Sequence, residues 1–228
     1  MKKIEIIWRE LLFQVIEKKN PPSPLRLRSG LRRASRRFTQ KELAKKFGFS
    51  TSTVFQALKV PRKMGAVRVT GRFFILEDPK KLLFHWASVR NPQKEIIFKG
   101  KVNLPILKIE GLVPPEVVFG GYSAARHILG EPPADYDQVW VYVKKRKTQN
   151  AKLKTTEENS KILEEIQERF EFTKGVPNLF ILKGDEFLKS YGEITTLAQT
   201  FVDLWNLPSW QAKDFTKALE AKIDEFLP

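Results

Sequence analysis

The chain has 228 residues, of which 42% are apolar, and its formal net charge at pH 7 is +15. It contains no cysteine, which excludes disulfides, thiolate metal sites and a thiol nucleophile. No apolar run reaches the ~18 residues that a membrane span requires, and residues 1–8 lack the small-residue cleavage site of a signal peptide. We therefore expect a folded cytoplasmic protein with no membrane contact.

The positive charge is concentrated in the first part of the chain. Residues 1–90 contain 22 Lys and Arg against 6 Asp and Glu, a net charge of +16, whereas residues 91–228 contain 19 and 20, a net charge of −1. Basic residues that only keep a protein soluble would be spread evenly, so this asymmetry indicates a nucleic-acid partner for one module. Together with a linker at Asn91-Pro92-Gln93, it predicts two domains, 1–90 and 91–228.

The first predicted helix covers residues 3–18, where apolar residues recur at helical spacing, so we expect it to be amphipathic. Three prolines after residue 20 end it. The next stretch, residues 25–37, has no acid and six arginines: Arg26, Arg28, Arg32, Arg33, Arg36 and Arg37. Guanidinium groups pair bidentately with phosphates, so we interpret this stretch as an arm along a nucleic-acid backbone, with a solvated loop as the alternative.

A pattern typical of a helix-turn-helix follows the arm. Thr39 and Glu42 form a capping box that opens a short helix running to about Lys46. Gly48 then supplies a left-handed turn, and Ser50 can cap a second helix.

In this second helix we expect Val54, Leu58 and Phe55 to face the core. Pro61 should shorten or kink the helix near its end. The second helix of a helix-turn-helix enters the major groove with its early residues at base edges. The candidate DNA-binding residues in and just after this helix are Thr51, Ser52, Thr53, Gln56, Lys59, Arg62 and Lys63.

Residues 67–76 predict a two-stranded hairpin that turns near Gly71, with Arg68 and Arg72 beside its tip as further DNA-binding candidates. Helix, turn, helix and basic hairpin in this order resemble a winged helix-turn-helix over about residues 38–77. The resemblance implies double-stranded DNA as the partner. Winged helices commonly bind as dimers, because two-fold symmetric operators match two-fold symmetric proteins, so a homodimer stays an open alternative.

After a helix predicted from Pro79 to about Arg90, strands alternate with helices, which predicts an α/β second domain and the α+β class for the whole chain. The expected strands are 95–99, 116–119, 138–144 and 178–182, and the expected helices are 122–129, 157–170, 195–205 and 208–226. We expect Trp205, Trp210 and Phe215 to lie in the core, with a protein interface as the alternative.

One group of residues in the second domain has a chemical interpretation. Phe119-Gly120-Gly121 is followed, after thirteen residues, by Asp135-Tyr136-Asp137. This resembles the signature of the nucleotidyltransferase fold, in which glycines let backbone amides approach a triphosphate and two acids share a divalent metal. The resemblance assigns nucleotide contact to Gly120, Gly121 and Ser123, and magnesium to Asp135 and Asp137.

The chain departs from that signature in two places. Gln138 stands where an apolar residue is usual, and the strand at 179–182 lacks a third acid. Without the third acid the metal would be poorly neutralised and the nucleophile poorly activated. We therefore expect no catalytic residue, metal or cofactor, and we keep a magnesium-dependent nucleotidyltransferase as the alternative.

The wider order of motifs resembles the AbiEi-like antitoxins of type IV toxin–antitoxin systems. The winged helix is followed by Gly120-Gly121-Tyr122-Ser123-Ala124-Ala125, by the apolar strand at 139–143 and by a later helix that carries Asp203-Leu204. The resemblance implies a DNA-binding domain that autoregulates an operon and a nucleotidyltransferase-like domain that opposes a partner toxin. We therefore predict a transcriptional regulator. A nucleotidyltransferase and a protein-interaction module are the alternatives.

Overall fold

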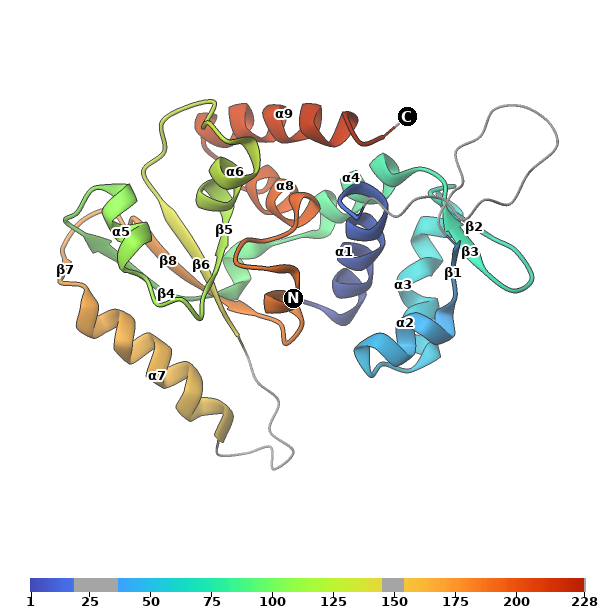
Figure 1. Cartoon of the computed structure of the whole chain (residues 1–228), viewed down its shortest axis with the longest axis horizontal. Coiled ribbons are helices and arrows are strands. Elements are labelled where there is room, and N and C mark those ends of the chain that lie inside the picture. The colour runs from blue at the N-terminus through green and yellow to red at the C-terminus, as the bar shows by residue number, and fades with distance from the viewer. Residues whose placement is uncertain (19–36, 145–153, 228) are drawn as a thin grey trace. The chain divides into compact units, whose positions relative to one another are not determined.

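The computed structural model describes residues 1–18, 37–144 and 154–227, with residues 154–160 described by their backbone (Figure 1). Both helices and strands are present, so the predicted α+β class is confirmed. The chain divides into two compact units. One comprises Lys2–Val89 and Ile223–Pro228, and the other comprises Met1 and Arg90–Lys222.

The first unit combines helices with a small antiparallel sheet. Its helices are α1 (Lys3–Ile16), α2 (Gln40–Phe47), α3 (Thr51–Lys63) and α4 (Pro79–Val89). Its strands are β1 (Arg37–Phe38), β2 (Val67–Val69) and β3 (Phe74–Leu76), in the order β1-β3-β2. The expected hairpin is confirmed, and it extends away from the helices of its unit (Figure 1). Strand β1 was not expected, because a two-residue strand carries no recognisable alternation.

The sequence signals predicted for the ends of α2 and for the start of α3 are confirmed. Thr39 and Glu42 exchange the two hydrogen bonds of a capping box at the start of α2. Gly48 has φ of +60°, and the Ser50 hydroxyl accepts a hydrogen bond from the Thr53 backbone amide at 3.1 Å. These contacts fix where α3 begins and therefore which of its residues face outward.

Two expectations about the helices of this unit differ in part from the structure. The first predicted helix is confirmed as α1, but its polar residues Glu5, Arg9, Glu10 and Gln14 are buried as well, so it does not present a polar face to solvent. The Glu5 carboxylate accepts a hydrogen bond from the Trp86 indole at 3.2 Å, which satisfies one of these buried groups. Helix α3 is not shortened by Pro61, since it continues to Lys63.

The second unit is built on a mixed five-stranded sheet in the order β5-β6-β8-β4-β7. Strands β6 and β8 are parallel, and the other neighbours are antiparallel. The strands are β4 (Ile96–Val102), β5 (Val118–Gly120), β6 (Val139–Lys144), β7 (Phe172–Thr173) and β8 (Leu179–Gly184). The helices are α5 (Ile106–Leu112), α6 (Gly121–Leu129), α7 (Lys154–Arg169), α8 (Leu197–Trp205) and α9 (Trp210–Asp224), and the 3₁₀ turns are Pro92–Glu95 and Leu188–Tyr191.

Strand β6 is buried on both faces. Val139, Val141 and Val143 belong to a core cluster with Ile109 of α5 and Ile166 of α7. On the alternate positions, Trp140 stacks on Phe180 of β8 at 4.9 Å between ring centroids, and Tyr142 bonds to a side chain of α8. Helices therefore cover both faces of the sheet, with α7 and α8 on opposite sides in Figure 1.

Every strand and helix predicted in this unit has a counterpart within a few residues, while α5 and β7 were not expected. Helix α5 contains Gly111 and follows Pro105, and it has only seven residues, so its periodicity is too short to recognise. Among the described residues, no helix combines the length and the apolar character that crossing a membrane requires.

Candidate nucleic-acid interface

Helix α3 separates its residues into a buried and an exposed side. Val54, Ala57, Leu58 and Pro61 face the interior. The exposed side comprises Thr51, Ser52, Phe55, Gln56, Lys59, Val60, Arg62 and Lys63. All but one of the DNA-binding candidates predicted on this helix are thus exposed together.

The exception is Thr53, which is half-buried. Its hydroxyl lies 2.9 Å from the Ser50 hydroxyl, so it belongs to the cap of the helix. Phe55 was expected in the core, but its side chain is 42% exposed, so that expectation is wrong. The buried side of α3 is completed by Ala57 and Pro61, so it does not need Phe55.

The exposed side of α3 carries only positive charge. No Asp or Glu occurs between Glu42 and Glu77, so α3 and the hairpin are free of carboxylates of their own. Lys59, Arg62 and Lys63 are all exposed near the end of the helix. Cations on one surface without interspersed acids attract a polyanion more strongly than a mixed surface does.

A contact between helices compensates for the proline inside α3. Pro61 has no backbone N–H, so the carbonyl of Ala57, four residues earlier, loses its usual helical donor. The Trp8 indole of α1 donates to this carbonyl at 2.7 Å, and the bond is buried. The carbonyl is therefore satisfied, which explains why α3 continues past Pro61.

The cations of the hairpin are not equivalent. Arg68 pairs with Glu77, which directly follows the neighbouring strand β3, with Nε 2.5 Å from the carboxylate oxygen, while Arg72 is exposed in the turn. Thr70 closes the turn by donating from its backbone and from its hydroxyl to the Phe73 carbonyl, at 2.8 Å and 2.7 Å. Arg72 is thereby presented on a defined turn, whereas the charge of Arg68 is partly neutralised.

Of the predicted arm, only its last arginine belongs to the described residues. Arg26, Arg28, Arg32, Arg33 and Arg36 lie outside them. Arg37 begins β1, is exposed, and has its guanidinium carbon 4.5 Å from the centre of the Phe73 ring. This cation–π contact places a further positive charge beside the hairpin turn.

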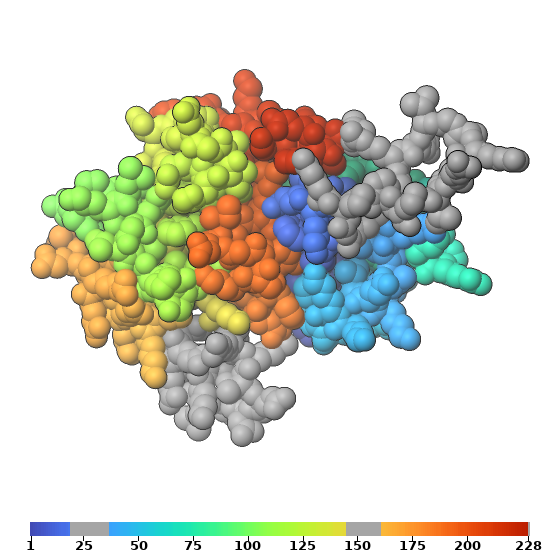
Figure 2. Space-filling view, in the orientation of Figure 1, coloured from blue at the N-terminus to red at the C-terminus, as the bar shows by residue number. Residues whose placement is uncertain are grey.

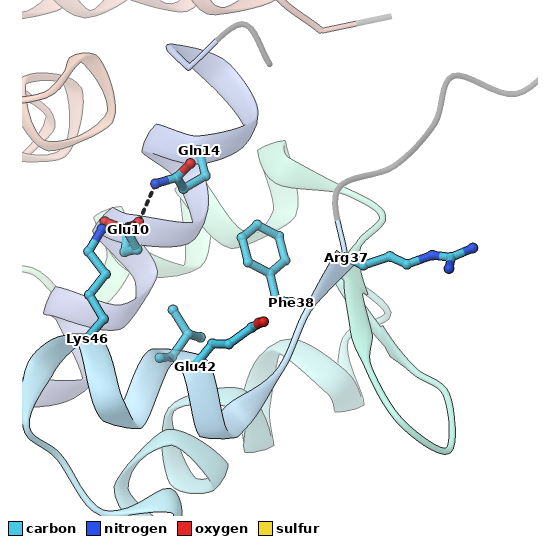
Figure 3. A pocket seen from close by; sticks show the side chains of 7 residues that line it. Glu10, Gln14, Arg37, Phe38, Glu42 and Lys46 are labelled. Carbon is cyan, nitrogen blue, oxygen red and sulfur yellow. Dashed lines mark hydrogen bonds and ion pairs between the residues drawn. The ribbon is translucent and has the colours of Figure 1, made fainter. Parts of the chain in front are cut away.

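A shallow hollow lies between α1, β1 and α2. It is lined by Glu10, Gln14, Arg37, Phe38, Glu42, Leu43 and Lys46. The Glu10 carboxylate accepts from the Gln14 amide and pairs with Lys46, both at 2.5 Å. The Arg37 guanidinium points away from the other labelled side chains (Figure 3). Glu10 and Lys46 thus pair with each other, Glu42 accepts a hydrogen bond from the Thr39 backbone amide, and Arg37 faces outward.

The two glycines of the nucleotidyltransferase-like motif are packed against β6. A Cβ atom on Gly120 would lie 2.6 Å from the Tyr142 ring, and one on Gly121, which has φ of +53°, would lie 3.2 Å from Trp140. Ser123 is fully buried, and its hydroxyl has no hydrogen-bond partner among the described residues. Close packing of aromatic rings therefore accounts for both glycines without a ligand.

Asp135 and Asp137 are exposed in the segment before β6, which lies on the surface of the second unit (yellow-green in Figure 2). This segment is held by Tyr136, whose hydroxyl donates to Glu110 and accepts from Arg126, both at 2.9 Å. Burial together with the negative charge of Glu110 raises the pKa of Tyr136 to about 12. Within the described ranges, no three His, Cys, Asp or Glu side chains are grouped as a metal site requires.

A buried polar network in the second unit was not predicted from the sequence. The Arg90 guanidinium donates to Asp203 at 2.7 Å, to Glu95 at 2.9 Å and to the Tyr142 hydroxyl at 3.1 Å, and Tyr142 donates to Asp203 at 2.7 Å. Burial alone would lower the pKa of Arg90, but the attraction of Asp203, Tyr142 and Glu95 raises it well above its ordinary value. Arg90 is therefore a buried, permanently charged group.

The aromatic residues near the end of the chain divide between core and surface. Phe215 is buried as expected. Trp205 and Trp210 are 49% and 64% exposed, so the expectation that they lie in the core is wrong. They flank the turn between α8 and α9, where the sequence pattern could not assign them a direction.

Comparison with known proteins identifies no relative. The sequence matches no protein-family model, and the searches of curated proteins and of solved structures give no match. The function is therefore inferred from the residues and their geometry.

Proposed function

We propose that this chain is a double-stranded-DNA-binding transcriptional regulator that inserts α3 into the major groove. The observation that carries the proposal is the exposed side of α3, which presents polar and basic side chains and no acid. The order α1, β1, α2, α3, β2, β3 with a β1-β3-β2 sheet also supports a winged helix-turn-helix. In this arrangement Ser52 and Gln56 reach base edges, and Lys59, Arg62, Lys63 and Arg72 neutralise phosphates.

The salt dependence of DNA binding tests the proposal. If the full chain engages about six phosphates, log K should fall with log salt at a slope of about −5. The double variant Arg62→Gln with Lys63→Gln should make that slope shallower by about 2. The matched variant Lys213→Gln with Lys217→Gln, at two exposed lysines of the second unit, should leave it unchanged. A slope near zero for the unmodified chain would remove the proposal.

Two single variants separate base reading from phosphate contact. Gln56→Ala should change the sequence preference in a selection from random duplexes, because an amide that bonds to a base edge carries sequence information. Arg72→Ala should weaken binding to all duplexes by a similar factor, because a phosphate contact carries none. Equal behaviour of the two variants would contradict the assigned roles.

In its finer form, the proposal is an AbiEi-like antitoxin, as the order of motifs suggests. The second unit would then bind a partner toxin, and the exposed Trp205 and Trp210 favour such an interface because tryptophan is enriched at binding hot spots. Retention of the product of an adjacent toxin gene by the full chain, and its loss in Trp210→Ala, would support this function. No retention of that product would count against it.

We do not extend the proposal to a nucleotidyltransferase. Asp135 and Asp137 precede β6 on an exposed segment, and close packing against Tyr142 and Trp140 already requires glycine at positions 120 and 121. Neither arrangement offers the chemistry of metal-assisted nucleotide transfer.

A further inference from the structure

Phe55 is an apolar residue within the polar side of α3. At ~100° per residue, Phe55, Ser52, Gln56 and Lys59 fall within an arc of about 100° on the helix surface. The Phe55 side chain is 42% exposed, and no acid occurs on this helix. A large exposed ring on a surface suited to a polyanion has to meet some apolar group when that surface is covered.

The major groove offers one apolar group of this kind. Phosphates, and the donors and acceptors of the base edges, are polar, whereas the C5-methyl group of thymine is apolar and projects into the groove. A phenylalanine ring cannot donate or accept a hydrogen bond to a base edge, but it can exclude water from this methyl group. Gln56, the next residue, has an amide that matches the adenine edge.

We infer that the Phe55 ring contacts the C5-methyl group of thymine in the bound duplex and that Phe55 with Gln56 selects A·T pairs. This inference rests on the proposed function, because it requires α3 to lie in the major groove. It adds a specificity-determining residue and the chemical feature that this residue reads. Val60, which is 45% exposed but lies outside the arc of Phe55 and Gln56, has no such role.

The experiment replaces thymine by deoxyuridine, which removes only the methyl group. A preferred duplex is first selected from a random library with the full chain, and each of its thymines is then replaced singly. Binding is measured by fluorescence anisotropy at constant salt. At one or two positions we expect the replacement to weaken binding about fourfold, which is the value of burying one methyl group.

The same duplexes are then measured with two variants. Phe55→Ala should bind the thymine duplex more weakly and should no longer distinguish thymine from deoxyuridine at those positions. Val60→Ala, the matched control at the other exposed apolar residue of α3, should keep the fourfold difference. Thermal unfolding of each variant checks that the fold is intact, which we expect because both side chains are partly in solvent.

The possible outcomes distinguish a failure of this inference from a failure of the proposed DNA-binding function. Salt-dependent binding without any position that distinguishes thymine from deoxyuridine overturns the inference and leaves the proposed function in place. Discrimination that persists unchanged in Phe55→Ala also overturns it, because another residue then reads the methyl group. Absence of DNA binding by the unmodified chain removes both.

Discussion

Pro61 has no backbone N–H, so the carbonyl of Ala57 lacks its usual hydrogen-bond donor within α3. A buried carbonyl without a partner costs about 1–3 kcal/mol. The Trp8 indole, 2.7 Å away, prevents this cost. A residue that appears in the sequence as a helix breaker is thus accommodated by a donor from a different helix, which no local pattern predicts.

We expect Trp8→Phe to lower the free energy of unfolding through the lost hydrogen bond and the lost ring volume. In a Pro61→Ala background, the backbone N–H restored at position 61 can bond to the Ala57 carbonyl, so the same change should cost about 1–2 kcal/mol less. Denaturant unfolding of the four proteins of this double-mutant cycle measures the difference. Strictly additive losses would show that the indole does not replace the missing donor.

The protonation of a single residue, His85, makes the stability of the fold depend on pH. Its ring packs edge-on against Trp8 at 5.0 Å, and burial lowers its pKa from the ordinary 6.5. The folded state thus binds a proton less readily than the unfolded state, so this residue's contribution is present above pH 6.5 and is lost as the pH falls through the folded-state pKa. His85→Gln should therefore show a smaller loss of stability between about pH 7 and pH 5. Parallel curves for the two proteins would refute this.

At the scale of elements, the network around Arg90 ties β6 to α8 through Tyr142 and Asp203. Burial raises the pKa of the Asp203 carboxyl, and the opposing attraction of Arg90 does not fully offset that effect. The cationic Arg90, only 3% exposed, therefore depends on its acidic partners for compensation.

Asp203→Asn should destabilise the chain by about 3–5 kcal/mol, because it leaves a buried guanidinium with an incomplete set of partners. Tyr142→Phe removes one neutral hydroxyl from the same network and should cost only about 1–2 kcal/mol. Urea unfolding of the two variants beside the unmodified chain measures both losses. Equal losses would show that the charge of Asp203 has no special part in holding the two elements together.

Elements whose ends carry their own signals were predictable from the sequence. The capping box at Thr39, the left-handed turn at Gly48 and the cap at Ser50 are local hydrogen-bonding rules, and each fixed a helix end correctly. Strand β1 and helix α5 were missed because two and seven residues are too few to show a period. Their positions depend on tertiary partners, such as the pairing of Phe38 with Phe74.

At the scale of the whole molecule, periodicity predicted the order of the elements, and composition located the positive charge along the chain. The charge asymmetry placed the basic surface in the first ninety residues, and the exposed cations of α3 follow from it. What the sequence could not predict is the direction of single apolar residues. Phe55, Trp205 and Trp210 satisfy the same hydrophobic patterns as core residues, and only the packed structure distinguishes them.

The hydrogen bond from Trp8 to Ala57 also couples two distant positions in the history of the chain. In a diverging lineage, replacement of Pro61 by a residue with its own amide hydrogen would release position 8 from the need for an indole. The reverse order, losing the indole first, would expose each intermediate to selection against a weakened fold. Substitutions at positions 8 and 61 should therefore appear as a correlated pair, with the change at 61 arising earlier.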